Sequence, residues 1–457
     1  MPRIDVADFM SRSTLGRTHL RVAVLCGICL LADGYDVGIF GAVVPSLIRE
    51  WHLSGTLAGL LGTASLAGML VGAITLGAAA DRIGRKPTMI AALLVFSVFA
   101  GLSALSPGPL AFGLLRFASG LGLGGVLPIA ATLSSEYAPA RWRSPFIMWT
   151  SVGFAAGGLL SALVSRLFVA EWGWRAVVGT GAFPLLLIPV LVGLLPESLE
   201  QLLRRGRTAR ARRIMAGIDG PYPVDASATL HVSAGGTGPK ASPARLFEPE
   251  YRARTVLLSV AFCGCLLMLY AILTWLPQFV ANAGFSVSSG LTMLVLLNGG
   301  GMLGMIVNGT LASRLPVVRV LVGSYLLTAL ALLLLGFAQT AALVAVSAFF
   351  AGLLGYASSV AENAYPSVVY PAQLRATATG WCLGIGRIGG MIGPYLGGAL
   401  LDARLPVAAD YAIFALAGVI SAGAVLAVHR LGAGRPGNPS AQLGVEVRPG
   451  SELGRRP

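Results

Sequence analysis

Uncharged apolar stretches long enough to cross a membrane recur along this chain at short intervals. A helix needs about 20 residues to cross a hydrocarbon core of ~30 Å. Charged residues make up only 11% of the chain, against roughly 25% in a typical soluble domain. The sequence therefore predicts an all-α polytopic membrane protein of twelve transmembrane helices, near residues 21–45, 56–80, 87–106, 109–134, 145–169, 175–195, 255–281, 288–312, 316–337, 340–365, 376–402 and 408–429.

The net charge of +14 would suggest a nucleic-acid partner in a soluble protein, so the placement of the basic residues matters. Most of them fall in loops on one side of the predicted membrane, and a central loop holds ten, from Arg204 to Arg254. Such a bias marks the cytoplasmic side of a polytopic protein. We expect a multi-pass protein of the cytoplasmic (inner) membrane with both termini in the cytoplasm, the lipid bilayer as its surroundings and no nucleic-acid partner. The first apolar segment is too long for a cleavable signal peptide.

The two halves of the sequence repeat each other. An offset of 232 superimposes Pro45 on Pro277, Arg82 on Arg314 and Arg143 on Arg375. Parallel six-helix repeats place a substrate site at their interface near the midplane, which a rocking motion exposes to each side in turn. We therefore expect an N-terminal bundle (1–200), a cytoplasmic central loop (201–253), a C-terminal bundle (254–432) and a cytoplasmic tail (433–457).

The central loop has two parts of different character. The six arginines between Arg204 and Arg213 suit an interfacial helix that lies against anionic lipid. Residues 219–243 are rich in Gly, Pro and Ser and predict a flexible linker.

A motif of glycines and charges follows the second predicted helix. From Gly77 to Lys86 it reads G-x-x-x-D-R-x-G-R-K, and it resembles in both pattern and position a signature of the major facilitator superfamily. A small residue allows close helix approach, and the charges suit a gate at the cytoplasmic interface. The alternative is a generic charge cluster that fixes topology. The members of the motif are Gly77, Asp81, Arg82, Gly84, Arg85 and Lys86.

Two carboxylates lie in the middle of the first predicted helix. A charge there costs at least ~2.5–3.5 kcal/mol on insertion scales, so such residues usually serve a function. Asp33 and Asp36 share a helix face because they are three residues apart. Two neighbouring carboxylates do not both ionise easily in a low dielectric, which suits proton coupling. The alternative is a structural salt bridge to an intramembrane arginine.

Three further charges fall inside predicted helices. An anionic substrate needs a cation, and arginine offers a bidentate fork. We favour Arg387, near the middle of its helix, as the substrate-binding cation, while Arg116 could bind substrate or pair with an acid. Glu362 is grouped with the substrate site, with gating or pairing to an arginine as its alternatives. Tyr35 and Trp381 could stack on an aromatic ring, although core or lipid-facing packing explains them as well.

The five cysteines fall in predicted helices, and the four histidines lie at helix ends or in loops. Neither type clusters with metal-ligand spacing. The sequence therefore predicts no metal, no cofactor and no enzyme activity.

With these motifs in place, nearly the whole chain resembles the aromatic acid:proton symporter family of the major facilitator superfamily. The resemblance implies uptake of a benzoate-like or hydroxybenzoate-like anion with protons, through the helix-one aspartates and Arg387. We assign Glu136, Arg143 and Arg375 to gating and expect a functional monomer. The resemblance rests on Asp33-Gly-Tyr-Asp36, Gly77 to Lys86, Arg116 with Gly120 to Gly125, Glu136-Tyr137, Tyr370 to Arg375 and Gly384 to Gly389.

One departure and two alternatives accompany this prediction. The loop motif of the second half, Asn308 to Pro316, lacks the acid of its first-half counterpart, which puts the details of gating in doubt. A facilitator of another solute, such as an aliphatic carboxylate, a sugar or an exported drug, is the first alternative. A membrane enzyme or sensor is the second.

Overall fold

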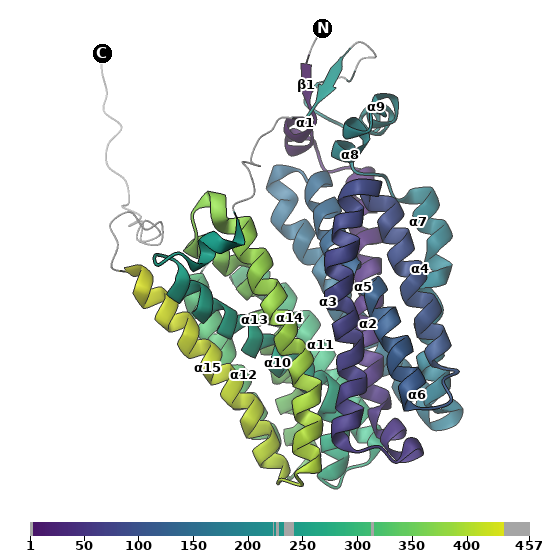
Figure 1. Cartoon of the computed structure of the whole chain (residues 1–457), viewed down its shortest axis with the longest axis vertical. Helices are drawn as coiled ribbons and strands as arrows, with labels where there is room; N and C mark the ends of the chain where they lie inside the picture. The colour runs from purple at the N-terminus through teal and green to yellow at the C-terminus, as the bar shows by residue number, and fades with distance from the viewer. Residues whose placement is uncertain (1–2, 223, 225–227, 233–241, 312–314, 434–457) are drawn as a thin grey trace, which may run out of the picture.

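The structure is a computed structural model that describes residues 3–222, 224, 228–232, 242–311 and 315–433. Its helices form two bundles that lie side by side, coloured purple to blue and green to yellow in Figure 1. The strand β1 (Arg3–Asp5) and the C-terminal end of α15 (Val407–Ala433) lie at the same end of the bundles. We call this the terminal end and the opposite one the distal end.

The first bundle contains five long helices and a composite sixth segment. Capping residues form a short turn between its first two helices. His52, which follows the last residue of α2, has a left-handed backbone conformation, and the side chain of Ser54 accepts a hydrogen bond from Leu57 N at the start of α3. The helices are α2 (Arg17–Trp51), α3 (Gly55–Ile83), α4 (Arg85–Ser103), α5 (Pro109–Tyr137) and α6 (Arg143–Gly179), which follows the short η1 (Ala140–Trp142). The sixth segment consists of the end of α6 after Gly173, followed by η2 (Thr180–Leu187) and α7 (Ile188–Leu194).

The second bundle repeats this plan. Its helices are α10 (Arg252–Asn282), α11 (Val287–Leu311), α12 (Val317–Gly336), α13 (Ala341–Val369), α14 (Ala372–Asp402) and α15 (Val407–Ala433). Four of them, α10, α13, α14 and α15, are several residues longer than the predicted apolar stretches, mainly because they continue past the hydrocarbon-length segment at the terminal end. Of the expected tail, only Ala433 lies inside the described residues.

Ten stretches of the described residues are long and apolar enough to cross a membrane. One of them, Met148–Leu194, covers two predicted helices. Gly173 divides it, with a non-helical φ of 73° that favours glycine and that lets the chain reverse at the distal end. The helix α14, with Arg375 and Arg387, is not among the ten. Dividing the stretch at Gly173 and adding α14 yields the twelve crossings expected from the sequence.

A small cap covers the terminal end of the first bundle. It consists of β1 (Arg3–Asp5), α1 (Val6–Arg12), α8 (Leu199–Arg204), α9 (Thr208–Ala216) and β2 (Thr229–His231). The two strands pair in parallel, with Arg3 opposite Thr229. The expectation that residues 219–243 form only a flexible linker was therefore wrong for the strand β2, whereas residues 223, 225–227 and 233–241 of that stretch lie outside the described residues.

The arginine-rich helix α9 packs on the protein itself. Its Ala211 and Met215 are buried in one cluster with Phe9 and Met10 of α1. The sequence predicted an interfacial helix against anionic lipid, and the structure adds that the N-terminal segment covers the apolar face of this helix. Several arginine side chains of α8 and α9 remain exposed.

The two bundles touch closely at the distal end along α3 and α14. A Cβ atom on Gly398 of α14 would lie 2.1 Å from the carbonyl oxygen of Gly55 of α3, so only glycines permit this approach. Nearer the middle, Thr63 Oγ1 donates to the carbonyl oxygen of Met391 at 2.8 Å. Towards the terminal end, Gly77 of α3 and Gly380 of α14 have nothing within 4 Å of their Cβ positions. The α3 and α14 faces therefore meet at the distal end and part towards the terminal end.

Candidate functional site

A buried ion pair joins α2 to α5 inside the first bundle. Arg116 Nη1 of α5 donates to Asp36 Oδ1 of α2, and both side chains are almost fully buried. Ser65 Oγ of α3 donates to the other carboxylate oxygen at 3.3 Å. The Arg116 guanidinium also lies 5.4 Å from the ring centroid of Phe40, within cation–π range. The sequence left two roles for Arg116, substrate binding or pairing with an acid. In the structure it pairs with an acid.

Asp33 lies on the same helix but faces the other bundle. It is 2% exposed, and its Oδ1 has no hydrogen-bond partner among the described residues. Arg387 of α14 and Asp36 both lie within electrostatic range of its carboxyl group. Tyr270 of α10 interacts electrostatically with both Asp33 and Arg387. An acid, a cation and a phenol from three helices thus converge where the bundles meet.

Arg387 has few partners among the described residues. Its Nη1 donates to the carbonyl oxygen of Met69 on α3 at 3.4 Å, across the interface. Among the described residues it forms no ion pair within 4 Å. A guanidinium has five N–H donors, so most of them remain for a bidentate contact with a carboxylate.

A second polar and aromatic layer lies between α6 and the C-terminal bundle. Tyr356 Oη of α13 donates to Asn298 Oδ1 of α11 at 2.9 Å, and both residues are buried. The ring of Phe154 on α6 lies 6.2 Å from that of Tyr356, and Gly158 leaves room for the Asn298 side chain. Sequence reasoning did not single out Asn298 or Tyr356. An asparagine inside an apolar helix is the signal that could have identified this layer.

The structure does not bring the remaining predicted substrate residues to this place. Tyr35 points into its own bundle, where its hydroxyl contacts Thr180 Oγ1 at 2.7 Å. Trp381 donates to Ser259 Oγ at 3.0 Å and packs on Phe247 of η3 (Pro243–Phe247). Glu362 is buried inside the C-terminal bundle, where Tyr325 Oη donates to its carboxyl at 2.7 Å.

The glycine and charge motif of the α3–α4 turn is held within the N-terminal bundle. Arg85 forms an ion pair with Glu136 at the end of α5 and donates to Ser198 Oγ at 2.9 Å. Glu197 Oε1 accepts hydrogen bonds from the backbone N of Arg85 and of Lys86, at 2.9 and 3.1 Å. Sequence reasoning missed Glu197. This acid lies just after the predicted helix 175–195, on the same predicted side of the membrane as the Arg85 motif, and could have been tested as a partner of the motif.

Other motif residues serve as backbone anchors or stay exposed. The carbonyl oxygens of Asp81 and Arg82 accept from Gln201 Nε2, each at 3.3 Å. Gly84 has a φ of 103°, which allows the turn between the two helices. Arg143 is exposed beside a pocket under the cap, and Arg375 Nε donates to the carbonyl oxygen of Tyr370 at 3.1 Å.

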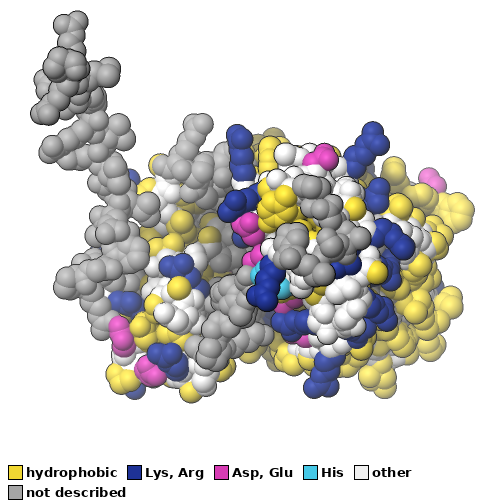
Figure 2. Space-filling model, turned by 90° about the horizontal axis from the view of Figure 1, so that it is seen from above, with side chains coloured by type: hydrophobic (Ala, Val, Ile, Leu, Met, Phe, Trp, Pro, Cys, Tyr) yellow, Lys and Arg dark blue, Asp and Glu magenta, His cyan; other side chains and the backbone are white. Residues whose placement is uncertain are grey.

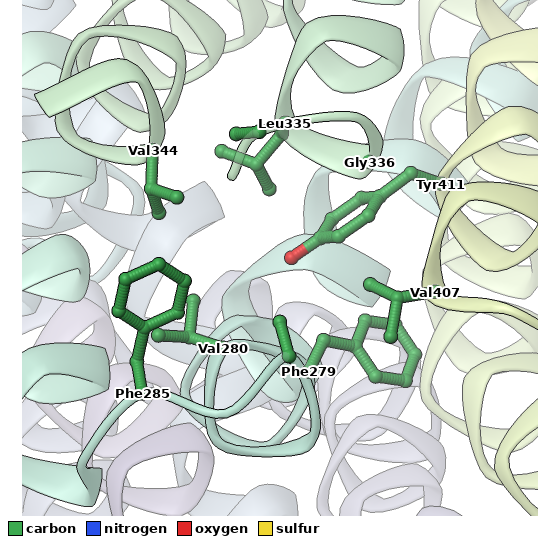
Figure 3. A pocket seen from close by; sticks show the side chains of 10 residues that line it. Phe279, Val280, Phe285, Leu335, Gly336, Val344, Val407 and Tyr411 are labelled. Carbon is green, nitrogen blue, oxygen red and sulfur yellow. The ribbon is translucent and has the colours of Figure 1, made fainter. Parts of the chain in front are cut away.

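A pocket of about 110 Å³ lies at the distal end of the C-terminal bundle. Figure 3 shows the Tyr411 hydroxyl pointing into it between Phe285, Leu335 and Val344. Its walls come from the ends of helices of one bundle only, so it is separate from the Asp33 and Arg387 site between the bundles.

The family model described as Major Facilitator Superfamily matches residues 26–360 and 299–457. The chain belongs to the major facilitator superfamily. The benzoate transport protein of Acinetobacter baylyi is 33% identical over 88% of this chain and 88% of its own. The gallate transporter of Pseudomonas putida is 33% identical over 93% and 95%, and a 4-hydroxybenzoate transporter of Pseudomonas aeruginosa is 33% identical over 87% and 90%.

Solved structures of other superfamily members share the fold. The partially occluded inward-open xylose transporter XylE of E. coli has a TM-score of 0.71 at 17% identity, over 88% of this chain and 97% of that one. A bacterial homologue of the lysosomal transporter Spinster, in an inward-facing form, has a TM-score of 0.67 at 18% identity, over 92% and 98%. This chain is thus a multi-pass membrane protein with the twelve-helix facilitator fold.

Proposed function

We propose that this facilitator imports an aromatic carboxylate together with a proton, by alternating access and as a monomer. The observation that carries the proposal is Arg387, a cation with free donors that faces the unpartnered Asp33 across the interface between the bundles. A carboxylate bound to Arg387 would be repelled by an ionised Asp33, so entry of the anion favours a proton on the acid. This arrangement supports coupling in which substrate and proton bind together.

Aromatic side chains beside the charges support a ring-bearing substrate. Tyr270 lies within electrostatic range of Arg387, and Phe154 packs on Tyr356 in the adjacent layer. Such rings offer faces and edges for stacking on another ring. The names of the relatives, which transport benzoate, gallate and 4-hydroxybenzoate, support the same substrate class.

The Asp36 and Arg116 pair supplies a second element of the proposed coupling. A proton on Asp36 would cancel the attraction that holds Arg116 and would leave the buried guanidinium without its counter-charge. Protonation is therefore expected to loosen the link between α2 and α5. We assign the proton-coupling role to both helix-one aspartates. The proton on Asp33 depends on the bound substrate, and the proton on Asp36 depends on the packing of α2 against α5.

We place the terminal end in the cytoplasm. Figure 2 looks onto this end and shows dark-blue lysine and arginine side chains spread over it, with yellow hydrophobic side chains along the flanks. Such an excess of basic residues marks a cytoplasmic face. The contact of α3 with α14 at the distal end then corresponds to an inward-facing state, in which the 1–200 and 254–432 bundles are open to the cytoplasm.

Uptake into proteoliposomes tests the proposal. Radiolabelled benzoate and 4-hydroxybenzoate are offered with and without an inward proton gradient, beside cyclohexanecarboxylate and xylose as non-aromatic competitors. We expect gradient-driven uptake of the aromatic acids, which Asp36→Asn and Arg387→Ala abolish. Arg49→Ala removes an exposed arginine at the distal end of α2 and is the matched control, expected to transport normally.

The outcomes separate the parts of the proposal. Uptake without any response to the proton gradient would refute coupling but retain the substrate. Uptake of xylose in preference to the aromatic acids would refute the substrate class and leave the fold as described.

A further inference from the structure

Glu362 lies in a buried cluster that the proposed transport site does not use. The residue is 2% exposed in the middle of the C-terminal bundle, between α10, α12 and α13. Tyr325 Oη donates to its carboxyl at 2.7 Å, and the Cys265 thiol forms a further hydrogen bond with it. Ser358 Oγ in turn contacts Cys265 Sγ at 3.7 Å. The carboxyl is thus surrounded by hydroxyl and thiol groups.

No cation compensates this carboxyl among the residues that the structure describes. Within them, Glu362 forms no ion pair with Lys, Arg or His. The titratable groups that face it from neighbouring helices are Tyr325 of α12, Cys263 and Cys265 of α10 and Cys382 of α14. Each of these is neutral in its ordinary protonated form. An ionised carboxylate here would be a buried and uncompensated charge, which costs several kcal/mol.

Asp36 in the other bundle provides the contrast. Its carboxylate is paired with the buried guanidinium of Arg116, a counter-charge that Glu362 lacks among the described residues. Glu362 has only neutral donors, so it holds a proton in the inward-facing arrangement and can release it only when its surroundings change. The Cys382 neighbour lies on α14, the helix that carries Arg387 and touches the other bundle, so a movement of α14 reaches the cluster directly.

We propose that Glu362 binds a second proton, in addition to the one proton handled by the two helix-one aspartates, which makes transport electrogenic. This inference rests on the proposed function, because it counts charges carried with an anionic substrate. A carboxylate of charge −1 that moves with one proton carries no net charge. A second proton, bound to the Glu362 carboxylate on the distal side and released to the terminal side, adds one positive charge per cycle.

The charge count has a measurable consequence. One elementary charge that crosses a potential of 100 mV gains about 2.3 kcal/mol, equivalent to roughly 50-fold accumulation at steady state. A transporter with one proton per anion gains no accumulation from the potential. The dependence of accumulation on potential therefore distinguishes one proton from two.

The experiment uses proteoliposomes at equal pH on both sides, with a potassium diffusion potential set by valinomycin, negative inside, and labelled benzoate as probe. We expect the wild type to accumulate benzoate several tens-fold at 100 mV. We expect Glu362→Gln to lose this accumulation but to keep uptake driven by a pH gradient. The glutamine retains an oxygen that accepts from Tyr325, so the helix contacts persist. Glu171→Gln, at an exposed acid of the distal end, is the control and should behave as wild type.

A second variant covers the case in which Glu362→Gln does not fold. Tyr325→Phe keeps the ring and removes the donor that favours the ionised carboxyl. We expect it to keep potential-driven accumulation while shifting its pH dependence upward. A pH dependence identical to that of the wild type would contradict the role of the Tyr325 and Glu362 pair.

The outcomes keep the two proposals apart. Wild-type uptake that follows the pH gradient but not the potential would overturn the second proton site and leave the proposed function standing. Potential-driven accumulation that persists in Glu362→Gln, or that requires sodium, would also overturn it. No benzoate uptake under either gradient would refute the proposed function itself, and this inference with it.

Discussion

Asp402, the last residue of α14, accepts two hydrogen bonds from Thr56 in the first turn of α3, from the backbone N at 2.8 Å and from the hydroxyl at 2.6 Å. The other carboxylate oxygen accepts from the backbone N of Gly55 at 2.6 Å. A carboxylate at a helix N-terminus satisfies amides that have no partner inside the helix and lies at the positive end of the helix dipole. Here the carboxylate belongs to the opposite bundle, so this cap holds the distal end closed.

Replacing Asp402 with alanine should shift the transporter towards distal opening. The loss of a capping side chain costs about 0.5–2 kcal/mol, and this cost falls only on the state in which the bundles meet. We expect a Thr63→Cys reporter on α3 to react several-fold faster with an impermeant maleimide added from the distal side. Asp402→Asn, which keeps one acceptor oxygen, should lie between alanine and wild type. Equal labelling rates in all three proteins would contradict the capping role.

The buried pair of Asp36 and Arg116 should make a large contribution to stability that depends on both partners. Asp36→Asn leaves the guanidinium buried without a counter-charge, so we expect the free energy of unfolding to fall by about 3–5 kcal/mol. Adding Arg116→Gln should recover most of this loss without restoring transport. Chemical denaturation in detergent measures the cycle. Asp33→Asn, at an acid without an ion pair, is the matched control and should change stability little.

Gly77 should matter for transport but not for the stability of the inward-facing state. Its Cβ position has no neighbour within 4 Å here, and the register of the α3 and α14 contacts places it opposite residues 376–377, within one turn of Gly380, when the terminal end closes. Gly77→Leu should therefore slow uptake at least ten-fold at unchanged melting temperature. Gly193→Leu, on α7 and equally free of neighbours, is the control. Unimpaired uptake by Gly77→Leu would argue against closure along these two faces.

Glu197 should stabilise the start of α4. Its carboxylate accepts from the backbone amides of Arg85 and Lys86, in the manner of a capping residue from outside the helix. Glu197→Ala should speed hydrogen–deuterium exchange over residues 85–88, whereas Glu197→Gln, with one acceptor oxygen left, should have a smaller effect. Unchanged exchange in the alanine variant would show that other groups hold this turn.

Hydropathy and charge placement predicted the twelve crossings, because lipid leaves the chain few other ways to satisfy its backbone. They also marked Asp33, Asp36, Arg116 and Arg387 as exceptional, since buried charge is costly wherever it occurs. The partners of these charges were not predictable. Asp36 pairs with Arg116 of α5, whereas Asp33 lies within electrostatic range of Arg387 of α14, although the two acids are only three residues apart. That difference depends on the rotation of α2 between the bundles, which hydropathy does not encode.

Contacts between segments far apart in the chain were likewise beyond sequence reasoning. The strand β2 consists of three residues inside a stretch rich in glycine and serine, and its only described strand partner, β1, lies near residue 4. The arginines of α9 predicted an interfacial helix against anionic lipid, but gave no sign that its Ala211 and Met215 are buried in one cluster with Phe9. Short strands and small apolar faces carry too little local signal to reveal such partners.

The pairing of β1 with β2 also shortens the connection between the two bundles. The strand pairing fixes residues 229–231 on the N-terminal segment, and the carbonyl oxygen of Leu246 in η3 accepts a hydrogen bond from Thr255 of α10, so only the covalent length of residues 232–242 separates these two anchored parts of the chain. At about 3.3–3.6 Å per residue, such a connection reaches roughly 36–40 Å when fully extended. The first few residues of the chain thereby set an upper bound on how far the bundles can swing apart, although they lie outside every helix that crosses the membrane.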